Sequence, residues 1–214
     1  MDNQNTIYCD RKDHDKRTTL SLYVSNICER ALKHGNCLII TTEKHLATWQ
    51  TLLDQLTKLT TFIYDNKEME GCAEDIQKCA LFHYDVTLRG QITQRNQIMK
   101  YDVILATGSS ICNSKTDLLK KLPFVQVIVD KAHLREQQES AAQILCKRVI
   151  CNTSKPLKEG LHGLMQMISI VNPQSLLNSG AQKLSAKVET LQELEMIWKM
   201  ASPVVRTHAL DETQ

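Results

Sequence analysis

Short runs of apolar residues recur along the chain, and most are apolar at nearly every position rather than at alternate ones. Continuous apolar runs of this length are typical of strands that are buried on both faces of a sheet. The pattern predicts strands at residues 37–41, 61–64, 102–106, 125–129 and 148–151.

Between these runs lie longer segments whose apolar residues recur every three or four positions, as on one face of a helix. This spacing predicts helices at residues 18–33, 46–59, 157–171 and 188–200. Strands that alternate with helices predict a mostly parallel sheet with helices on both faces, here with about five to seven strands. We therefore expect a single α/β lobe.

Two stretches depart from the alternation. Residues 66–95 are polar and predict an insertion, and residues 174–186 are small and polar, as in a linker. We expect the lobe itself at residues 1–173, and a linker with a C-terminal helical extension of the same lobe at residues 174–214.

Composition argues against disorder across the whole chain and against collagen and coiled-coil arrays. The 42% of hydrophobic and 23% of charged residues are close to the globular average, and the net charge of +2 neither indicates nor excludes a nucleic-acid partner. No apolar run approaches the roughly 18 residues of a membrane helix, and the polar start contains no secretory signal, so we expect no membrane association. The eight cysteines lack zinc spacing and predict reduced thiols in a cytosolic or nuclear protein.

The most informative segment is VIVDKAH at residues 127–133. An apolar strand that ends in Asp-x-Ala-His has the form of the Walker B element of helicase-like ATPases. In that element the Asp, here Asp130, binds the magnesium ion of the nucleotide, and the Glu that follows it orients the attacking water. Lys131 stands at the position of this Glu, and His133 completes the element.

Three further segments surround the Walker B element. They are LIITTEKHLATW from Leu38, YDVILATG from Tyr101 and VICNTSKPLKEGLHGLMQMISIVNP from Val149. Their order resembles the first RecA-like lobe of the Swi/Snf superfamily of helicase-like, DNA-dependent ATPases, and the resemblance covers about residues 10–211. The short gap between the Asp-x-Ala-His segment and the segment from Val149 is most similar to that of the lodestar-like transcription-termination branch.

The resemblance implies ATP and Mg²⁺ as cofactors and places a phosphate loop at residues 10–17. Lys16 falls on the position of the phosphate-loop lysine and Arg17 on that of the magnesium-binding hydroxyl. Thr18 or Thr19 supplies this hydroxyl only after a register shift. Asp13 and Asp15 replace the glycines whose bare backbone N–H groups wrap the phosphates. Each added carboxylate repels a phosphate at 4 Å by about 1–4 kcal/mol.

The family's turn that couples nucleotide state to DNA contact corresponds to residues 153–156. Thr153 and Pro156 are kept, whereas Ser154 and Lys155 depart from the family pattern, so we expect the coupling to be lost. In the family His133 would link the Walker B element to this turn; the alternative is an ordinary polar contact at a strand end.

The segment after the strand at residues 37–41 is where family members touch the DNA backbone. Thr41, Thr42 and Lys44 are the corresponding candidates, because a helix N-terminus with Thr and Lys binds phosphate well. The alternative is a capped helix start that faces solvent.

These observations predict a catalytically defective Swi/Snf-type module that associates with DNA or chromatin proteins in the nucleus. Two alternatives stay open: an active DNA-dependent ATPase with a divergent phosphate loop, and a truncated duplicate without a selected role. The 214 residues leave no room for the second RecA-like lobe, so we expect no translocation along DNA.

Overall fold

The computed structural model describes residues 5–9, 16–30, 36–64, 98, 100–113, 119–155, 160–172 and 205–207. The strands are β1 (Thr6–Cys9), β2 (Cys37–Thr41), β3 (Thr61–Tyr64), β4 (Val103–Thr107), β5 (Gln126–Asp130), β6 (Val149–Thr153) and β7 (Val205–Thr207). They form one sheet in the order β3-β4-β2-β5-β6-β1-β7. Every neighbouring pair is parallel, so the carboxyl ends of all the strands lie at the same edge.

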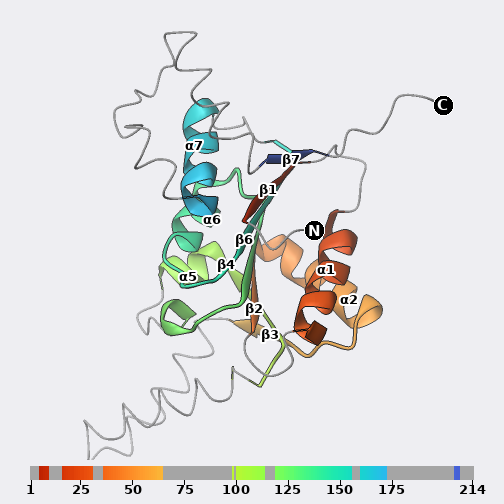
Figure 1. Ribbon diagram of the computed structural model, residues 1–214. Helices are drawn as coiled ribbons and strands as arrows, with labels where there is room; N and C mark the ends of the chain where they lie inside the picture. Colours follow the sequence, from red (N-terminus) through yellow and green to blue (C-terminus); the bar gives the residue numbers. More distant parts are fainter. Residues whose placement is uncertain are drawn as a thin grey trace, which may run out of the picture.

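Helices cover both faces of this sheet (Figure 1). On one face lie α1 (Lys16–Arg30) and α2 (Glu43–Leu56), and on the other lie α5 (Gly108–Cys112), α6 (Arg135–Ala141) and α7 (Gly160–Val171). A 3₁₀ turn at Leu119–Lys121 precedes β5. Within the described part of the chain, no helix has the length and apolar character needed to cross a membrane.

Each central strand contributes to two separate cores. In β2, Leu38 and Ile40 pack with the core under α5, α6 and α7, whereas Ile39 packs with the core under α1 and α2. All five residues of β2 are buried, and the same holds for β4, β5 and β6. Burial on both faces explains the continuous apolar runs and confirms the predicted α/β architecture.

The observed elements differ from the predicted ones in detail. The strands predicted at residues 37–41 and 61–64 have these bounds, and the other three lie one or two residues further along the chain. The pattern did not predict β1, β7, α5 or α6. The last three are only three, five and seven residues long, and β1 was missed although Ile7, Tyr8 and Cys9 are buried. The predicted insertion, linker and fourth helix, at residues 66–95, 174–186 and 188–200, lie outside the described residues.

Strand β1 brings the start of α1 to the carboxyl edge of the sheet. It lies between β6 and β7, and the side chain of Asn5 fixes its amino end. Asn5 Nδ2 donates to the carbonyl oxygen of Val171 at 2.9 Å, and Asn5 Oδ1 accepts from Val149 N at 2.8 Å. The chain then returns as α1, whose first residues meet the ends of β5 and β6.

Gly108 allows the close contact between α5 and α6. A methyl group at Gly108 would lie 3.0 Å from both the backbone oxygen and Cγ of Glu136. We expect Gly108→Ala to lower the free energy of unfolding by about 1 kcal/mol, because overpacking of about 1–3 kcal/mol exceeds the gain in helix propensity. Urea denaturation measures this change. Ser109→Ala is the control, since Ser109 lies exposed on the same helix, and a stabilised Gly108→Ala variant would contradict the analysis.

Candidate functional site

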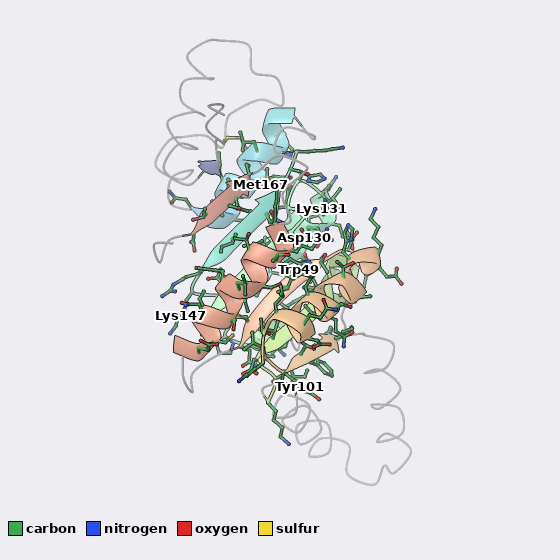
Figure 2. All side chains as sticks on the ribbon, turned by 90° about the vertical axis from the view of Figure 1, so that its right-hand side faces the viewer. Trp49, Tyr101, Asp130, Lys131, Lys147 and Met167 are labelled. Atoms are coloured by element: carbon green, nitrogen blue, oxygen red, sulfur yellow. The ribbon has the colours of Figure 1, made fainter. Side chains whose placement is uncertain are left out.

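The carboxyl ends of β2, β5 and β6 bring together three polar residues that are far apart in the sequence. Thr41, Asp130 and Thr153 each end one of these strands, and each is almost fully buried. Figure 2 shows Asp130 beside Trp49 and Lys131, with Tyr101 at the other end of the sheet. Parallel strands place their carboxyl ends at one edge, so a fold of this type builds its site here.

Asp130 is the centre of this group, and its side chain is only 1% exposed. Five groups of the described chain donate hydrogen bonds to its carboxylate: Arg17 Nε (3.1 Å), Thr41 Oγ1 (3.0 Å) and Trp49 Nε1 (3.0 Å) to Oδ2, and Asn152 Nδ2 (2.9 Å) and Lys131 N (3.1 Å) to Oδ1. Both oxygens are therefore fully occupied by groups of the protein itself.

These donors keep Asp130 ionised in spite of its burial. Burial raises the pKa of this carboxyl, but the charge of Arg17 and the hydrogen bonds from Trp49, Arg17 and Thr41 outweigh it. The net result is a pKa below the ordinary value. Hydrogen bonds from a cation and from neutral donors both favour the charged form of an acid.

The first two residues of α1 place two cations at this edge. Arg17 forms an ion pair with Asp130, and Lys16 Nζ donates to the backbone carbonyl of Thr153 at 2.9 Å. The side chain of Arg17 is 20% exposed, and Lys16 is buried. Thr18 follows in the first turn of α1 and is partly buried.

The described residues do not fit a magnesium ion. Mg²⁺ requires octahedral coordination by oxygens at about 2.0–2.1 Å, usually with one or two carboxylates. Both oxygens of Asp130 are occupied by donors, and the guanidinium of Arg17 stands where the ion would balance the charge. Nowhere in the described part of the chain do three His, Cys, Asp or Glu side chains gather as metal ligands. The predicted phosphate-loop residues 10–15 lie outside that part.

Lys131 follows Asp130 in a left-handed backbone conformation, with φ of 58°. This conformation costs a residue with a side chain about 1–2 kcal/mol. It turns the chain out of β5, and the Lys131 carbonyl accepts a hydrogen bond from Leu134 N at 2.9 Å. An ammonium group has three donors and no acceptor, so Lys131 cannot take a proton from an attacking water.

His133 joins the ends of β5 and β6. Its Nδ1 lies 2.8 Å from Thr153 Oγ1, and both residues are buried. Thr153 Oγ1 also accepts from Lys155 N at 3.1 Å, which fixes the first part of the turn after β6. Pro156, the other residue predicted for this turn, lies outside the described residues.

The three candidates for contact with a DNA backbone differ in their surroundings. Thr41 is fully buried and its hydroxyl donates to Asp130, so its side chain offers no surface to a DNA backbone in this arrangement. Thr42 precedes α2, and within the described part of the chain its side chain makes no capping hydrogen bond and its buried hydroxyl has no partner. Lys44 lies exposed in the first turn of α2.

Positive charge accumulates at this edge around His45. The pKa of His45 is lowered, first by burial and then by the nearby charges of Arg17, Lys131 and Lys44, with Asp130 acting in the opposite direction. The cations near His45 outnumber the anions, and this disfavours protonation of its imidazole.

Sequence reasoning missed three residues of this site. Trp49 lies in the helix predicted at residues 46–59 and its ring is buried in the core, but its indole N–H also donates to Asp130. Asn152 lies in the segment from Val149 but was given no role, and Gln137 lies in no motif; Gln137 Nε2 donates to the carbonyl of Thr41 at 3.3 Å. The one usable signal was the indole itself, because a buried Trp usually has a hydrogen-bond acceptor.

The ionised state of Asp130 makes stability depend on pH. The folded state holds the pKa of Asp130 below the unfolded value of about 3.9. The contribution of this carboxylate to the free energy of unfolding is therefore complete above about pH 4, and it is lost as the pH falls through the lower, folded value. We expect Asp130→Asn to cost about 2–3 kcal/mol near pH 7, since Arg17 is partly solvated, and to flatten this acid limb. Urea denaturation at several pH values measures both effects.

Asp54→Asn is the matched control, because it removes a carboxylate from an exposed position on α2. Equal pH profiles for Asp130→Asn and the unaltered chain would show that Asp130 contributes nothing to the acid limb.

A family model and solved structures both match this chain. The family model described as the SNF2-related domain matches residues 8–206. The structure is similar to the "Sulfolobus solfataricus SWI2/SNF2 ATPase core in complex with dsDNA", with a TM-score of 0.66, 15% identity, and coverage of 96% of this chain and 40% of that one. It is equally similar to the "Sulfolobus solfataricus SWI2/SNF2 ATPase core domain", with a TM-score of 0.67, 14% identity, and coverage of 99% and 40%.

This chain thus spans about two fifths of the length of both archaeal structures. No curated protein sequence matches it. At such low identity the structural likeness shows the fold alone, and it confirms the predicted RecA-like α/β lobe. Since the family model extends over nearly the whole chain, the chain belongs to the SNF2-related domain family.

Proposed function

We propose that this chain is a SNF2-related lobe that does not hydrolyse ATP and that acts as a binding module for DNA or chromatin in the nucleus. The ion pair between Arg17 and Asp130 carries this proposal. The family implies nucleotide use, but in this chain the carboxylate that would bind magnesium already has a cation of its own.

The internal cation competes with any external one. Arginine keeps its charge throughout the physiological pH range, so the pair with Asp130 persists wherever the lobe is folded. A magnesium ion would have to displace the guanidinium from a carboxylate that is only 1% exposed, and four further donors would have to release their acceptor. Lys16, the residue that would reach the phosphates, is likewise engaged by the carbonyl of Thr153.

Hydrolysis lacks a second component as well. Lys131 stands where the water-orienting carboxylate is needed, and an ammonium group cannot perform that role. A nucleotide bound without magnesium would therefore still lack the water-orienting carboxylate at this position. The two losses involve different residues, so the reversal of one does not restore turnover.

A surface for DNA is supported by the charge at the same edge. Lys44 is exposed at the start of α2, where the helix N-terminus adds partial positive charge, and Lys131 and His45 lie nearby. One of the similar structures is described as a complex with dsDNA. Contacts of this kind bind phosphate groups and carry no sequence preference.

Nucleotide binding tests the first half of the proposal. We expect no change in thermal unfolding at millimolar ATP with magnesium, whereas a ligand at 100 times its dissociation constant stabilises by about 2.7 kcal/mol. Binding of a fluorescent ATP analogue, with and without magnesium, gives an independent measurement. Lys16→Ala should lose stability, because it removes the bond to Thr153, but should respond to nucleotide as the unaltered chain does.

Magnesium-dependent binding that Lys16→Ala abolishes would overturn the proposal and favour an active ATPase with a divergent phosphate loop. Arg17→Thr returns a hydroxyl to this position and removes the internal cation. Magnesium-dependent stabilisation of Arg17→Thr alone would agree with the proposal, since only that variant leaves Asp130 without its cation.

DNA binding tests the second half. We expect duplex DNA to bind with an affinity that falls with salt, and Lys44→Ala to weaken it by about 3- to 10-fold and reduce the log–log salt slope by about 1. Fluorescence anisotropy over a range of salt concentrations measures both. Lys58→Ala is the matched control, because Lys58 is exposed beyond the other end of α2. Equal losses in the two variants would contradict a contact at Lys44.

A further inference from the structure

Two thiols meet at the edge of the sheet opposite Asp130. Cys28 lies in the last turn of α1 and Cys37 is the first residue of β2, so nine positions of sequence separate them. Their sulfur atoms are 3.5 Å apart and share a hydrogen bond, and both cysteines are free thiols. They belong to the core under α1 and α2.

The two thiols have unequal environments. Cys28 is partly exposed, whereas Cys37 is only 1% exposed. The hydrogen bond from Cys37 lowers the pKa of Cys28 and outweighs both the burial of Cys28 and the carboxylates of Asp102 and Glu29. The same hydrogen bond and burial raise the pKa of Cys37. Since the thiolate is the reactive form, Cys28 is the nucleophile of the pair and Cys37 retains its proton.

The other described cysteines lack this arrangement. Burial raises the pKa of Cys9, Cys112, Cys146 and Cys151. Among the described cysteines, Cys28 alone combines a lowered pKa, partial exposure and a second thiol within hydrogen-bond distance. Reactive cysteines that respond to oxidants commonly have a resolving thiol beside them.

We propose that Cys28 and Cys37 form a dithiol that hydrogen peroxide converts into a disulfide. The Cys28 thiolate attacks one oxygen of the peroxide, the O–O bond breaks, and sulfenic acid and hydroxide are produced. The Cys37 sulfur then attacks the Cys28 sulfur, the S–O bond breaks, and the proton of Cys37 leaves with the hydroxyl as water. The proton that the Cys28 thiol released on ionisation converts the hydroxide of the first step into water, so two thiols and one peroxide give one disulfide and two waters.

The geometry requires only a small movement. The sulfurs must approach by about 1.5 Å to reach the disulfide bond length of about 2.05 Å. The bond would tie the carboxyl end of α1 to β2, while the amino end of the same helix carries Lys16 and Arg17. The proposal does not depend on the proposed function, because the two thiols lie at the amino ends of the strands and Asp130 lies at the carboxyl ends.

Peptide mapping of the full chain tests the proposal directly. The chain is treated with hydrogen peroxide, its remaining thiols are alkylated in denaturant, and it is digested with trypsin without reduction. Cleavage after Arg17, Arg30, Lys33 and Lys44 places Cys28 in peptide 18–30 and Cys37 in peptide 34–44. We expect these two peptides joined, with the loss of two hydrogen atoms, before any other described cysteine has reacted.

Variants separate the roles of the two thiols. In Cys37→Ser, the sulfenic acid of Cys28 has no resolving partner, so dimedone should trap it at least ~10-fold more than in the unaltered chain. In Cys28→Ser, the buried Cys37 should stay reduced. Cys112→Ser is the control and should form the joined peptide as the unaltered chain does, since Cys112 contacts Gln143 and no thiol.

Three results would overturn the proposal: oxidation of Cys112 or Cys146 before Cys28, a disulfide between two chains, or Cys28 that reaches the sulfinic acid while Cys37 stays reduced. The peptide map of the unaltered chain decides among these even where a serine variant fails to fold. Circular dichroism of each variant identifies such failures before the dimedone experiment.

Discussion

An ionised carboxylate that is almost completely removed from water is the constraint on which this structure depends. A buried charge is tolerated only when ion pairs and hydrogen bonds replace its lost hydration. For Asp130 these come from four different elements: Arg17 on α1, Trp49 on α2, Thr41 on β2 and Asn152 on β6. The single carboxylate therefore fixes the positions of two helices and two strands. The same group decides the chemistry of the site, because its oxygens have no capacity left for a metal ion.

The sequence allowed much of this arrangement to be predicted, and physical reasons explain the rest. Continuous apolar runs identified β2, β4, β5 and β6 because both of their faces are buried, and a shorter run identified β3 at the edge of the sheet. β7 has only three residues, and β1 was missed although three of its four residues are buried. The Walker B motif located Asp130. The resemblance placed Arg17 and Asp130 at the same magnesium site, but the ion pair between them could not be inferred, because motif positions do not give the directions of side chains. The same holds for the hydrogen bond from Thr41 to Asp130.

The proposed loss of ATPase activity differs from simple decay of a motif. A nucleotide-bound magnesium ion binds and leaves, whereas a guanidinium that belongs to the chain is always present. If Arg17 replaces the ion, the edge of the sheet stays in one arrangement. The contact between His133 and Thr153 then does not change with the state of a nucleotide. A lobe with one arrangement suits a role as a permanent binding surface, and it is unsuited to a cycle driven by hydrolysis.

The place of β1 in the sheet has a consequence for biosynthesis. β1 is translated before the other described strands, yet it pairs with β6, and the hydrogen bond between Asn5 and Val149 joins residues 144 positions apart. At translation rates of about 5–20 residues per second, β1 waits about 7 to 29 seconds for this partner. During that interval Ile7 and Tyr8, which are buried in the finished lobe, remain exposed on the nascent chain. Exposed apolar surface and unpaired strand edges make such folding intermediates prone to aggregation.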